Sequence, residues 1–288
     1  MVDEKTRQSN RLTACLKIYF PQILRWFDDV SAPIVGALLQ RWPSLQELQH
    51  AHPGTLKKFF LGHNCRSQQR IEERIQAICQ AVPATCDQAV LQGEAAAARG
   101  FVALLKTLRE NIAELDQQIE LLVASHPDRA VFASLPGAGA VMVPRLIVAF
   151  GTRRERFDSA FEMQCYSGIA PITEASGKSQ WVHLRWSCPK FLRQTFHEFA
   201  FLSIRSCGWA QAYYQHQRDQ KQSHPAAVRA LAYKWIRIIF RCWKDGKLYD
   251  EQTYLQSLQR RRSPLGTSAT APGWKLVAGF QKLCADPS

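Results

Sequence analysis

Apolar residues recur at helical spacing over the first 80 residues of the chain. Leu12 and Leu16 fall on one face of a helix predicted over residues 5–20, and further short apolar faces follow it. Ser44, with Glu47 three residues later, has the pattern of a capping box that begins one of these short helices. The pattern predicts an all-helical first region.

A longer apolar stripe follows, with spacings that alternate between three and four residues. It comprises positions 98, 101, 105, 108, 112, 115, 119 and 122. A repeat of 3.5 residues is the seam of a coiled coil, because it keeps one stripe of side chains facing a partner helix. An amphipathic helix of a bundle explains a stripe of this length equally well. Either interpretation requires a partner, and the helix over residues 5–20 is the nearest one in the same chain.

Beyond residue 130 the pattern predicts three longer helices and one short strand. The helices span about residues 189–205, 209–220 and 225–244, whereas Trp181–Trp186 alternates with a period of two, as strands do. We therefore predict a mainly α fold. It comprises a helical connector (1–88), a coiled-coil helix (89–126), a compact helical domain with a helix-hairpin-helix and a short β-hairpin (127–255), and a basic, loosely ordered tail (256–288).

Composition narrows the class of protein. The 288 residues include 37 Lys and Arg against 24 Asp and Glu, and residues 151–250 alone hold 16 basic and eight acidic residues. No apolar run is long enough to span a membrane, the first ten residues are polar, and the nine cysteines form no C-x-x-C pair. We expect a reduced, cytoplasmic protein that binds nucleic acid and no membrane.

A glycine-containing turn is predicted between two helices at Ser134–Gly139. Gly137 and Gly139 allow a tight turn that brings backbone N–H groups to the surface, which is how a helix-hairpin-helix holds a DNA phosphate. The simpler alternative is a turn between two core helices. Arg153 and Arg154, which follow shortly afterwards, favour phosphate binding.

The helix over residues 225–244 carries a basic stripe. Lys234, Arg237, Arg241 and Lys244 recur at intervals of three or four residues, opposite an apolar stripe. A run of charge is usually only a solvated face. We expect these residues to have no acidic partner at helical spacing, which favours contact with a nucleic-acid backbone.

The loop before the predicted strand holds two Ser-Gly pairs, the second of them at Ser176-Gly177. A serine in such a loop, near Lys178, His183 and Arg185, can attack a phosphorus atom while the cations hold the phosphate charge. Taken alone, Ser-Gly is usually just a turn.

One group of residues has the spacing of zinc ligands: His50, His52, His63 and Cys65. A helix-to-helix turn at Pro53-Gly54 explains these residues more simply, and no pair of carboxylates has the arrangement of an acid–base site. The sequence therefore predicts no metal or other cofactor bound by this chain.

Several of these motifs occur in a characteristic order. They are Leu135–Gly139, Tyr166–Pro171, Ser176-Gly177, Lys190–Gln194 and the helix over 227–243. In this order they resemble the insertion-sequence one-ten family transposases, which are related to the Piv invertases and described as bridge-RNA-guided recombinases. The resemblance covers nearly the whole chain.

The resemblance implies chemistry and partners. The family's nucleophile is the serine of the second of the two Ser-Gly pairs, which follows the G-[IL]-[AT]-P element. That serine is Ser176 here, and the resemblance implies that it forms a phosphoserine link to a DNA end. The ends of the insertion sequence and its target are implied as DNA partners, with a guide RNA, in a bacterial nucleoid. Lys190 and Arg193 join the expected nucleic-acid contacts, and a homo-oligomer is expected through residues 98–122.

The resemblance also implies a domain that this sequence is expected to lack. Intact members begin with a RuvC-like domain whose carboxylates hold Mg²⁺, and Met1 lies where that domain would have ended. We therefore expect a truncated DNA-binding transposase that acts by serine-dependent strand exchange and is inactive alone, so whether this chain is itself an enzyme is left open. The alternative is a non-catalytic, oligomerising nucleic-acid-binding protein that modulates a full-length transposase. Under the first hypothesis the hydroxyl of Ser176 occupies a cavity lined by cationic side chains.

Overall fold

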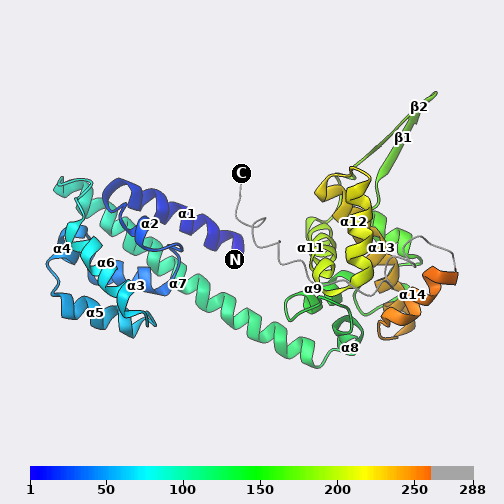
Figure 1. Cartoon of the computed structure of the whole chain (residues 1–288), viewed down its shortest axis with the longest axis horizontal. Helices are drawn as coiled ribbons and strands as arrows, with labels where there is room; N and C mark the ends of the chain where they lie inside the picture. The colour runs from blue at the N-terminus through cyan, green and yellow to red at the C-terminus, as the bar shows by residue number, and fades with distance from the viewer. Residues whose placement is uncertain (261–288) are drawn as a thin grey trace. The chain divides into compact units, whose positions relative to one another are not determined.

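The computed structural model describes residues 1–260 and divides the chain into two compact units, Met1–Gln118 and Ile119–Ser288. The described residues are mostly helical, with one small antiparallel sheet of two strands (Figure 1). The predicted mainly α fold with a short β-hairpin is confirmed. None of the helices within residues 1–260 has the length and apolar character needed to cross a membrane.

The first unit is built from helices α1 to α7, and the predicted local signals begin several of them. Their bounds are α1 Val2–Tyr19, α2 Ile23–Trp26, α3 Pro33–Arg41, α4 Leu45–Gln49, α5 Pro53–Gly62, α6 Gln68–Gln80 and α7 Gln88–Ala124. The hydroxyl of Ser44 accepts a hydrogen bond from the backbone N–H of Glu47 at 3.3 Å, so the predicted cap begins α4. Pro33 and Pro53 stand in the first turns of α3 and α5, where a missing N–H costs no helical hydrogen bond.

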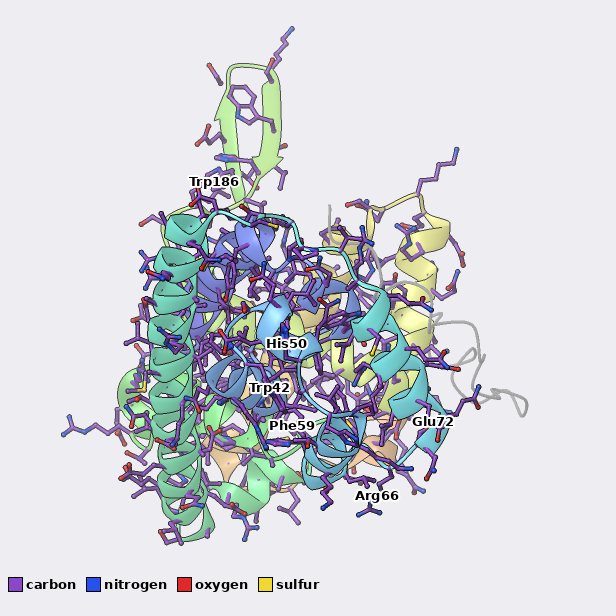
Figure 2. All side chains as sticks on the ribbon, turned by 90° about the vertical axis from the view of Figure 1, so that its left-hand side faces the viewer. Trp42, His50, Phe59, Arg66, Glu72 and Trp186 are labelled. Atoms are coloured by element: carbon purple, nitrogen blue, oxygen red, sulfur yellow. The ribbon has the colours of Figure 1, made fainter. Side chains whose placement is uncertain are left out.

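The core of the first unit is apolar and rich in aromatic rings. Leu12 and Leu16 are fully buried, as the helical pattern predicts. The rings of Trp42 and Phe59 pack with centroids 5.2 Å apart, and Figure 2 shows both among the helices of this unit. Burial of these faces stabilises the short helices, which are too short to be stable in isolation.

Helix α7 uses its apolar stripe in two ways. Its first part is buried in the core of the first unit through Leu91, Ala98 and Leu105. The Cys15 thiol of α1 donates a hydrogen bond to a carbonyl of α7 at 3.2 Å, so the expected partner helix in the same chain is confirmed for this part. Further along, Leu115 is 43% exposed, as is Ile119. The second half of the stripe therefore lacks a partner among the described residues.

The second unit begins with short helices and ends with long ones. Its elements are α8 Arg129–Ala133, α9 Met142–Phe150, the 3-10 helix η1 Arg154–Arg156, α10 Ala160–Tyr166, β1 Ile172–Ser176, β2 Ser179–His183, α11 Lys190–Ser206, α12 Gly208–Asp219, α13 His224–Asp245 and α14 Glu251–Arg260. The strand predicted over 181–186 is β2, which begins two residues before the predicted start and ends three residues before the predicted end. Residues 256–260 of the predicted tail lie in α14, and residues 261–288 lie outside the described part of the chain.

Three tryptophans form the centre of the second unit. Trp209, Trp235 and Trp243 are fully buried, and each indole N–H has an acceptor. The Trp235 indole N–H, for example, donates to the hydroxyl of Ser203 at 2.7 Å, which ties α13 to α11. Because a buried N–H without an acceptor is costly, these bonds fix how α13 packs among its neighbours.

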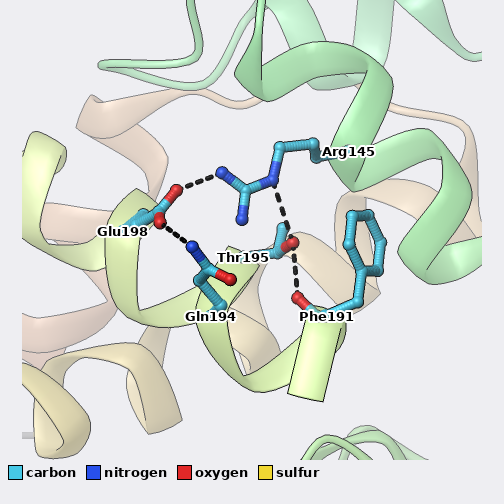
Figure 3. A network of polar contacts seen from close by, with 5 residues as sticks. All are labelled: Arg145, Phe191, Gln194, Thr195 and Glu198. Carbon is cyan, nitrogen blue, oxygen red and sulfur yellow. Dashed lines mark hydrogen bonds and ion pairs between the residues drawn. The ribbon is translucent and has the colours of Figure 1, made fainter. Parts of the chain in front are cut away.

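A polar network joins α9 to α11 at the edge of this core (Figure 3). Arg145 on α9 donates from Nε to the hydroxyl of Thr195 at 3.2 Å, and its guanidinium pairs with the carboxylate of Glu198. Gln194 donates to the other oxygen of that carboxylate at 2.6 Å. The network orients α11, the helix that carries Arg193.

Candidate nucleic-acid interface

Strands β1 and β2 form a hairpin whose side chains are nearly all exposed. Ser176 pairs with Ser179 in the register, so Gly177 and Lys178 make a two-residue turn. Gly177 has φ +59°, the left-handed conformation that this kind of turn requires of a glycine. Figure 1 shows the hairpin extending away from helices α11 to α13 of its unit. A two-stranded hairpin has little stability of its own, so such an arm suits contact with a partner.

The structure places Ser176 at the end of β1, beside the turn. Its side chain is exposed and makes no hydrogen bond to any described residue. The expected cavity of cationic side chains is therefore wrong for the described part of the chain, because the strand carries Ser176 away from the helices. Lys178, exposed in the turn, is the cationic residue nearest to it in sequence. The hydroxyl of Ser176 is accessible to a polymer, but cationic side chains among the described residues do not surround it.

Arg193 on α11 holds the segment that follows the hairpin. Its guanidinium donates to the carbonyl of Arg185 at 2.7 Å and to that of Trp186 at 3.1 Å, and Nη2 lies 2.6 Å from the sulfur of Cys188. Arg193 was expected to contact nucleic acid. The structure shows the Nε and Nη2 donors of Arg193 engaged within the chain, as in a positioning residue, and its contact with nucleic acid stays a prediction.

Gly168, in the G-I-A-P element, packs against the same segment. It has φ +71°, and a Cβ placed on it would lie 2.8 Å from the Cβ of Cys188 and closer still to that residue's sulfur. The Nε of Arg193 would be 3.3 Å away. Close packing and backbone conformation both require glycine here. The motif thus brings the loop before β1 against the loop after β2.

An open pocket of about 610 Å³ lies at the foot of the hairpin. Its lining consists of Glu162, Cys165, Tyr166, Arg185, Ser187, Cys188 and Pro189. Tyr166 is 48% exposed, and Arg185 is half-buried. The guanidinium of Arg185 forms no ion pair or hydrogen bond with any described residue, and its Nε is buried. The pocket therefore combines an accessible ring with an unpaired cation.

Helices α11 and α13 bring Arg193, His197 and Arg229 close enough for their charges to interact. Burial lowers the pKa of His197, and the charges of Arg229 and Arg193 lower it further. Burial also lowers the pKa of Arg229, with a smaller contribution from Arg193. We did not predict His197 or Arg229 as site residues. The four-residue spacing of Arg193 and His197, which puts them on one helix face, was the available signal.

The predicted glycine turn connects α8 to α9. Gly137 has φ +83°, and a Cβ there would meet the Ser206 hydroxyl at 2.9 Å and the backbone of Leu202 at 3.3 Å. Close packing on α11 thus explains Gly137 without a phosphate. Gly139 is exposed, and its carbonyl accepts the first hydrogen bonds of α9, from Met142 at 2.9 Å among others. The turn between helices is present, and its phosphate binding stays a prediction.

The two arginines after this turn have different surroundings. Arg153 is exposed. The guanidinium of Arg154 pairs with both carboxylate oxygens of the buried Asp128 and lies 4.8 Å from the ring centroid of Trp243. These donors of Arg154 stabilise the fold, and its expected contact with nucleic acid stays a prediction.

The basic stripe of α13 is largely engaged within the chain. The ammonium of Lys234 lies 4.5 Å from the centroid of an α12 ring, and burial lowers its pKa. Arg241 lies 3.7 Å from the carboxylate of Asp245, so the expectation of no acidic partner is wrong. Lys244 donates to two main-chain carbonyls before α10. Arg237 is the member of the stripe that is exposed and unpaired among residues 1–260.

The histidines with zinc-like spacing serve helix ends instead. The Nδ1 of His52 accepts from the backbone N–H of Gly54 at 3.1 Å and begins α5. His50 and His63 each place Nδ1 within 2.8 Å of a carbonyl four residues earlier. Figure 2 shows His50 close to its own helical segment. The described residues contain no group of three or more His, Cys, Asp or Glu side chains arranged to hold a metal ion.

Residues 129–215, from the start of α8 into α12, match the family model for transposases of the IS116/IS110/IS902 family. This segment of the chain is similar to transposases of that family. The match includes the glycine turn, the hairpin with Ser176 and the loop held by Arg193. Helix α13 with its basic stripe lies beyond it.

Proteins of three insertion elements are similar to longer parts of the chain. The mini-circle putative transposase for IS117 of Streptomyces coelicolor is 30% identical over 139 residues, which are 48% of this chain and 34% of that protein. An uncharacterized 43.6 kDa protein of insertion element IS110 from the same species is 27% identical over 255 residues, 86% of this chain and 61% of the relative. An uncharacterized 42 kDa protein of IS900 from Mycobacterium paratuberculosis is 26% identical, over 59% of this chain and 44% of its own length. The chain thus spans about a third to three fifths of the length of these relatives.

Proposed function

We propose that this chain takes part in DNA transposition and that Ser176 is the nucleophile of strand exchange. The family match supports the transposase role, and the exposed position of Ser176 beside the turn of a projecting hairpin is the observation that carries the assignment. A hydroxyl at such a place can approach a phosphodiester within a polymer, which a buried serine cannot. Lys178 in the turn would face the phosphate charge.

The proposed step conserves the phosphodiester bond energy. The Oγ of Ser176 forms a bond to phosphorus, one P–O bond of the DNA backbone breaks, and the departing DNA oxygen takes up the proton lost by the serine. The phosphoserine is later attacked by a DNA hydroxyl, which restores the serine. The described residues offer no base bonded to Ser176 and no donor set that fits the Mg²⁺ implied by the resemblance. We therefore derive no step through a metal.

DNA binding would involve the exposed cations that the structure leaves unpaired. Lys178, Lys190 and Arg153 are all exposed, as is Arg237 on α13. Each phosphate that they neutralise releases counterions, so duplex affinity should fall with a log-log salt slope of about 0.9 per phosphate. A role for a guide RNA and a location in the bacterial nucleoid belong to the same proposal and rest on the resemblance alone.

The test is to trap the covalent link. The purified chain is incubated with Mg²⁺, with the RuvC-like domain implied by the resemblance supplied in trans, and with nicked, end-labelled DNA that carries insertion-sequence ends. Labelled protein that survives denaturing electrophoresis is then measured. Ser176→Ala should abolish the labelled band. Ser179→Ala is the matched control, because Ser179 is the partner of Ser176 in the hairpin register. An undiminished band in Ser176→Ala would remove the assignment.

A second candidate function is non-catalytic and rests on α7. Leu115 and Ile119 are each 43% exposed and Leu122 is 71% exposed, all on the predicted seam. We propose that a second copy of the chain covers this seam as a coiled coil, so that the protein could modulate a longer transposase by assembling with it. Wild-type protein that binds DNA and oligomerises but never forms the labelled band would favour this function.

Oligomerisation through the seam has its own test. Leu115→Asn combined with Leu122→Asn should reduce the molar mass measured by light scattering to that of a monomer. Leu104→Asn is the matched control, since Leu104 is 50% exposed and lies off the seam. A mass unchanged by the double substitution would contradict the coiled coil.

A further inference from the structure

The pocket at the foot of the hairpin has the components of a nucleotide site. We infer that it binds one unpaired nucleotide of a DNA strand, with the base on Tyr166 and a phosphate on Arg185. This inference rests on the proposed DNA-binding function and names a ligand for a part of the second unit that lies apart from Ser176.

The size and the ring fit this ligand. A volume of about 610 Å³ lies within the usual range of small-molecule pockets, and it is too small for a duplex. Tyr166 is 48% exposed, and its ring packs against the buried Phe157 with ring centroids 5.9 Å apart and planes tilted by 49°. A ring that is packed against the core and still half exposed is a platform on which an unpaired base can stack.

The unpaired guanidinium of Arg185 favours an anionic ligand in the pocket. The main chain of Arg185 is fixed by Arg193, whereas its guanidinium has no partner among the described residues. The carboxylate in the lining, that of Glu162, accepts from the backbone N–H of Asp158 at 2.8 Å and does not pair with Arg185. A half-buried guanidinium without an acceptor is unfavourable, so a phosphate oxygen would satisfy it.

Two further arginines add positive charge near the pocket. Arg193 contacts Cys188 in the lining, and Arg229 lies close enough to Arg193 to feel its charge. The Nε of Arg229, like that of Arg185, is buried without a hydrogen-bond partner in the described part of the chain. Positive charge close to a pocket favours an anionic ligand over a neutral one or a cation.

The pocket is separate from Ser176 but close to it along the hairpin. From Ile172 at the foot to Ser176 at the turn there are four residue steps, or roughly 13 Å of extended strand. A nucleotide in the pocket would therefore neighbour the phosphate that Ser176 attacks, and would not be the one attacked. Trp186, which is 77% exposed and lies at the base of the hairpin in Figure 2, offers a surface for an adjacent base.

The experiment uses a single-stranded 12-mer that contains 2-aminopurine, whose fluorescence is quenched when it stacks. The full chain should bind the 12-mer and quench the probe. Tyr166→Ala should weaken binding by about five- to a hundredfold and abolish the quenching, because one stacking contact is lost. Tyr166→Phe should retain both, which separates loss of the ring from loss of the hydroxyl. A reducing agent is present throughout, since Cys165 and Cys188 line the pocket.

Arg185→Gln supplies an independent arm of the experiment. It should weaken binding of the 12-mer and reduce its log-log salt slope by about 0.7, the value for one phosphate on a single strand. Arg66→Gln is the control for net charge, because Arg66 is exposed on the first unit and lies at the edge of that unit in Figure 2. It should leave the slope and the quenching as they are.

Duplex DNA of the same length distinguishes the two ways to fail. If the wild-type chain binds duplex DNA but Tyr166→Ala and Arg185→Gln bind the 12-mer as the wild type does, the nucleotide pocket is overturned and the proposed function stands. If the wild-type chain binds neither the 12-mer nor the duplex, the proposed function is wrong, and this inference, which rests on it, is wrong as well. Loss of 12-mer binding by both variants, with duplex binding retained, supports the pocket.

Discussion

Replacing Gly168 by alanine should destabilise the second unit through two separate costs, one from the backbone conformation and one from packing. The φ of +71° would cost an alanine about 1–2 kcal/mol, as left-handed backbone does for residues with a Cβ. The added methyl would also overlap Cys188, whose Cβ would be 2.8 Å away, and overpacking of this kind costs about 1–3 kcal/mol. The expected total is a loss of about 2–5 kcal/mol in the free energy of unfolding.

A double-mutant cycle tests this division. Cys188→Gly removes both atoms that the new methyl would meet, so in the double variant the packing cost of Gly168→Ala should disappear while the backbone cost remains. The coupling measured by urea unfolding, followed by the fluorescence of the buried tryptophans, should therefore be about 1–3 kcal/mol in favour of the double variant. Additive effects within about 0.5 kcal/mol, or a neutral Gly168→Ala, would refute the reasoning.

Two further predictions concern charged groups of the second unit. Asp128→Asn removes the partner of Arg154 in a pair whose carboxylate side chain is 8% exposed, and thermal unfolding should show a loss of about 1–3 kcal/mol in the free energy of unfolding. Arg241→Gln should change this free energy very little, because the arginine of that pair is 83% exposed. For His197 the folded pKa lies below the unfolded value, so the unfolded state binds more protons as the pH falls through about 6.5 and stability decreases. His197→Gln should flatten the loss of stability between about pH 7.5 and pH 5.5 in urea titrations, and His216→Gln should not; equal slopes in all three proteins would contradict this assignment.

Local signals in the sequence predicted the elements well. Pro189 precedes α11, and Gly246 ends α13 with φ +64°, because each acts on the backbone beside it. The roles of individual cations could not be predicted in the same way. Arg154 is held by Asp128, 26 residues away, and Lys244 by carbonyls about 90 residues away, so their engagement depends on packing that no periodicity encodes.

The position of the free cations favours the hairpin over α13 as the centre of the proposed nucleic-acid interface. An arginine that donates to a carbonyl or carboxylate of its own chain must lose that bond before it can hold a phosphate, and the lost bond offsets the gain. This applies to Arg193 and to Arg154. Lys178, Arg185 and Lys190 have no such bond within the described residues, and they stand along one stretch of chain from the turn of the hairpin to the start of α11. Net charge favours a nucleic-acid partner, but only the unpaired cations can indicate the surface that it would contact. These three lie on the hairpin that carries Ser176 and on the segment that follows it.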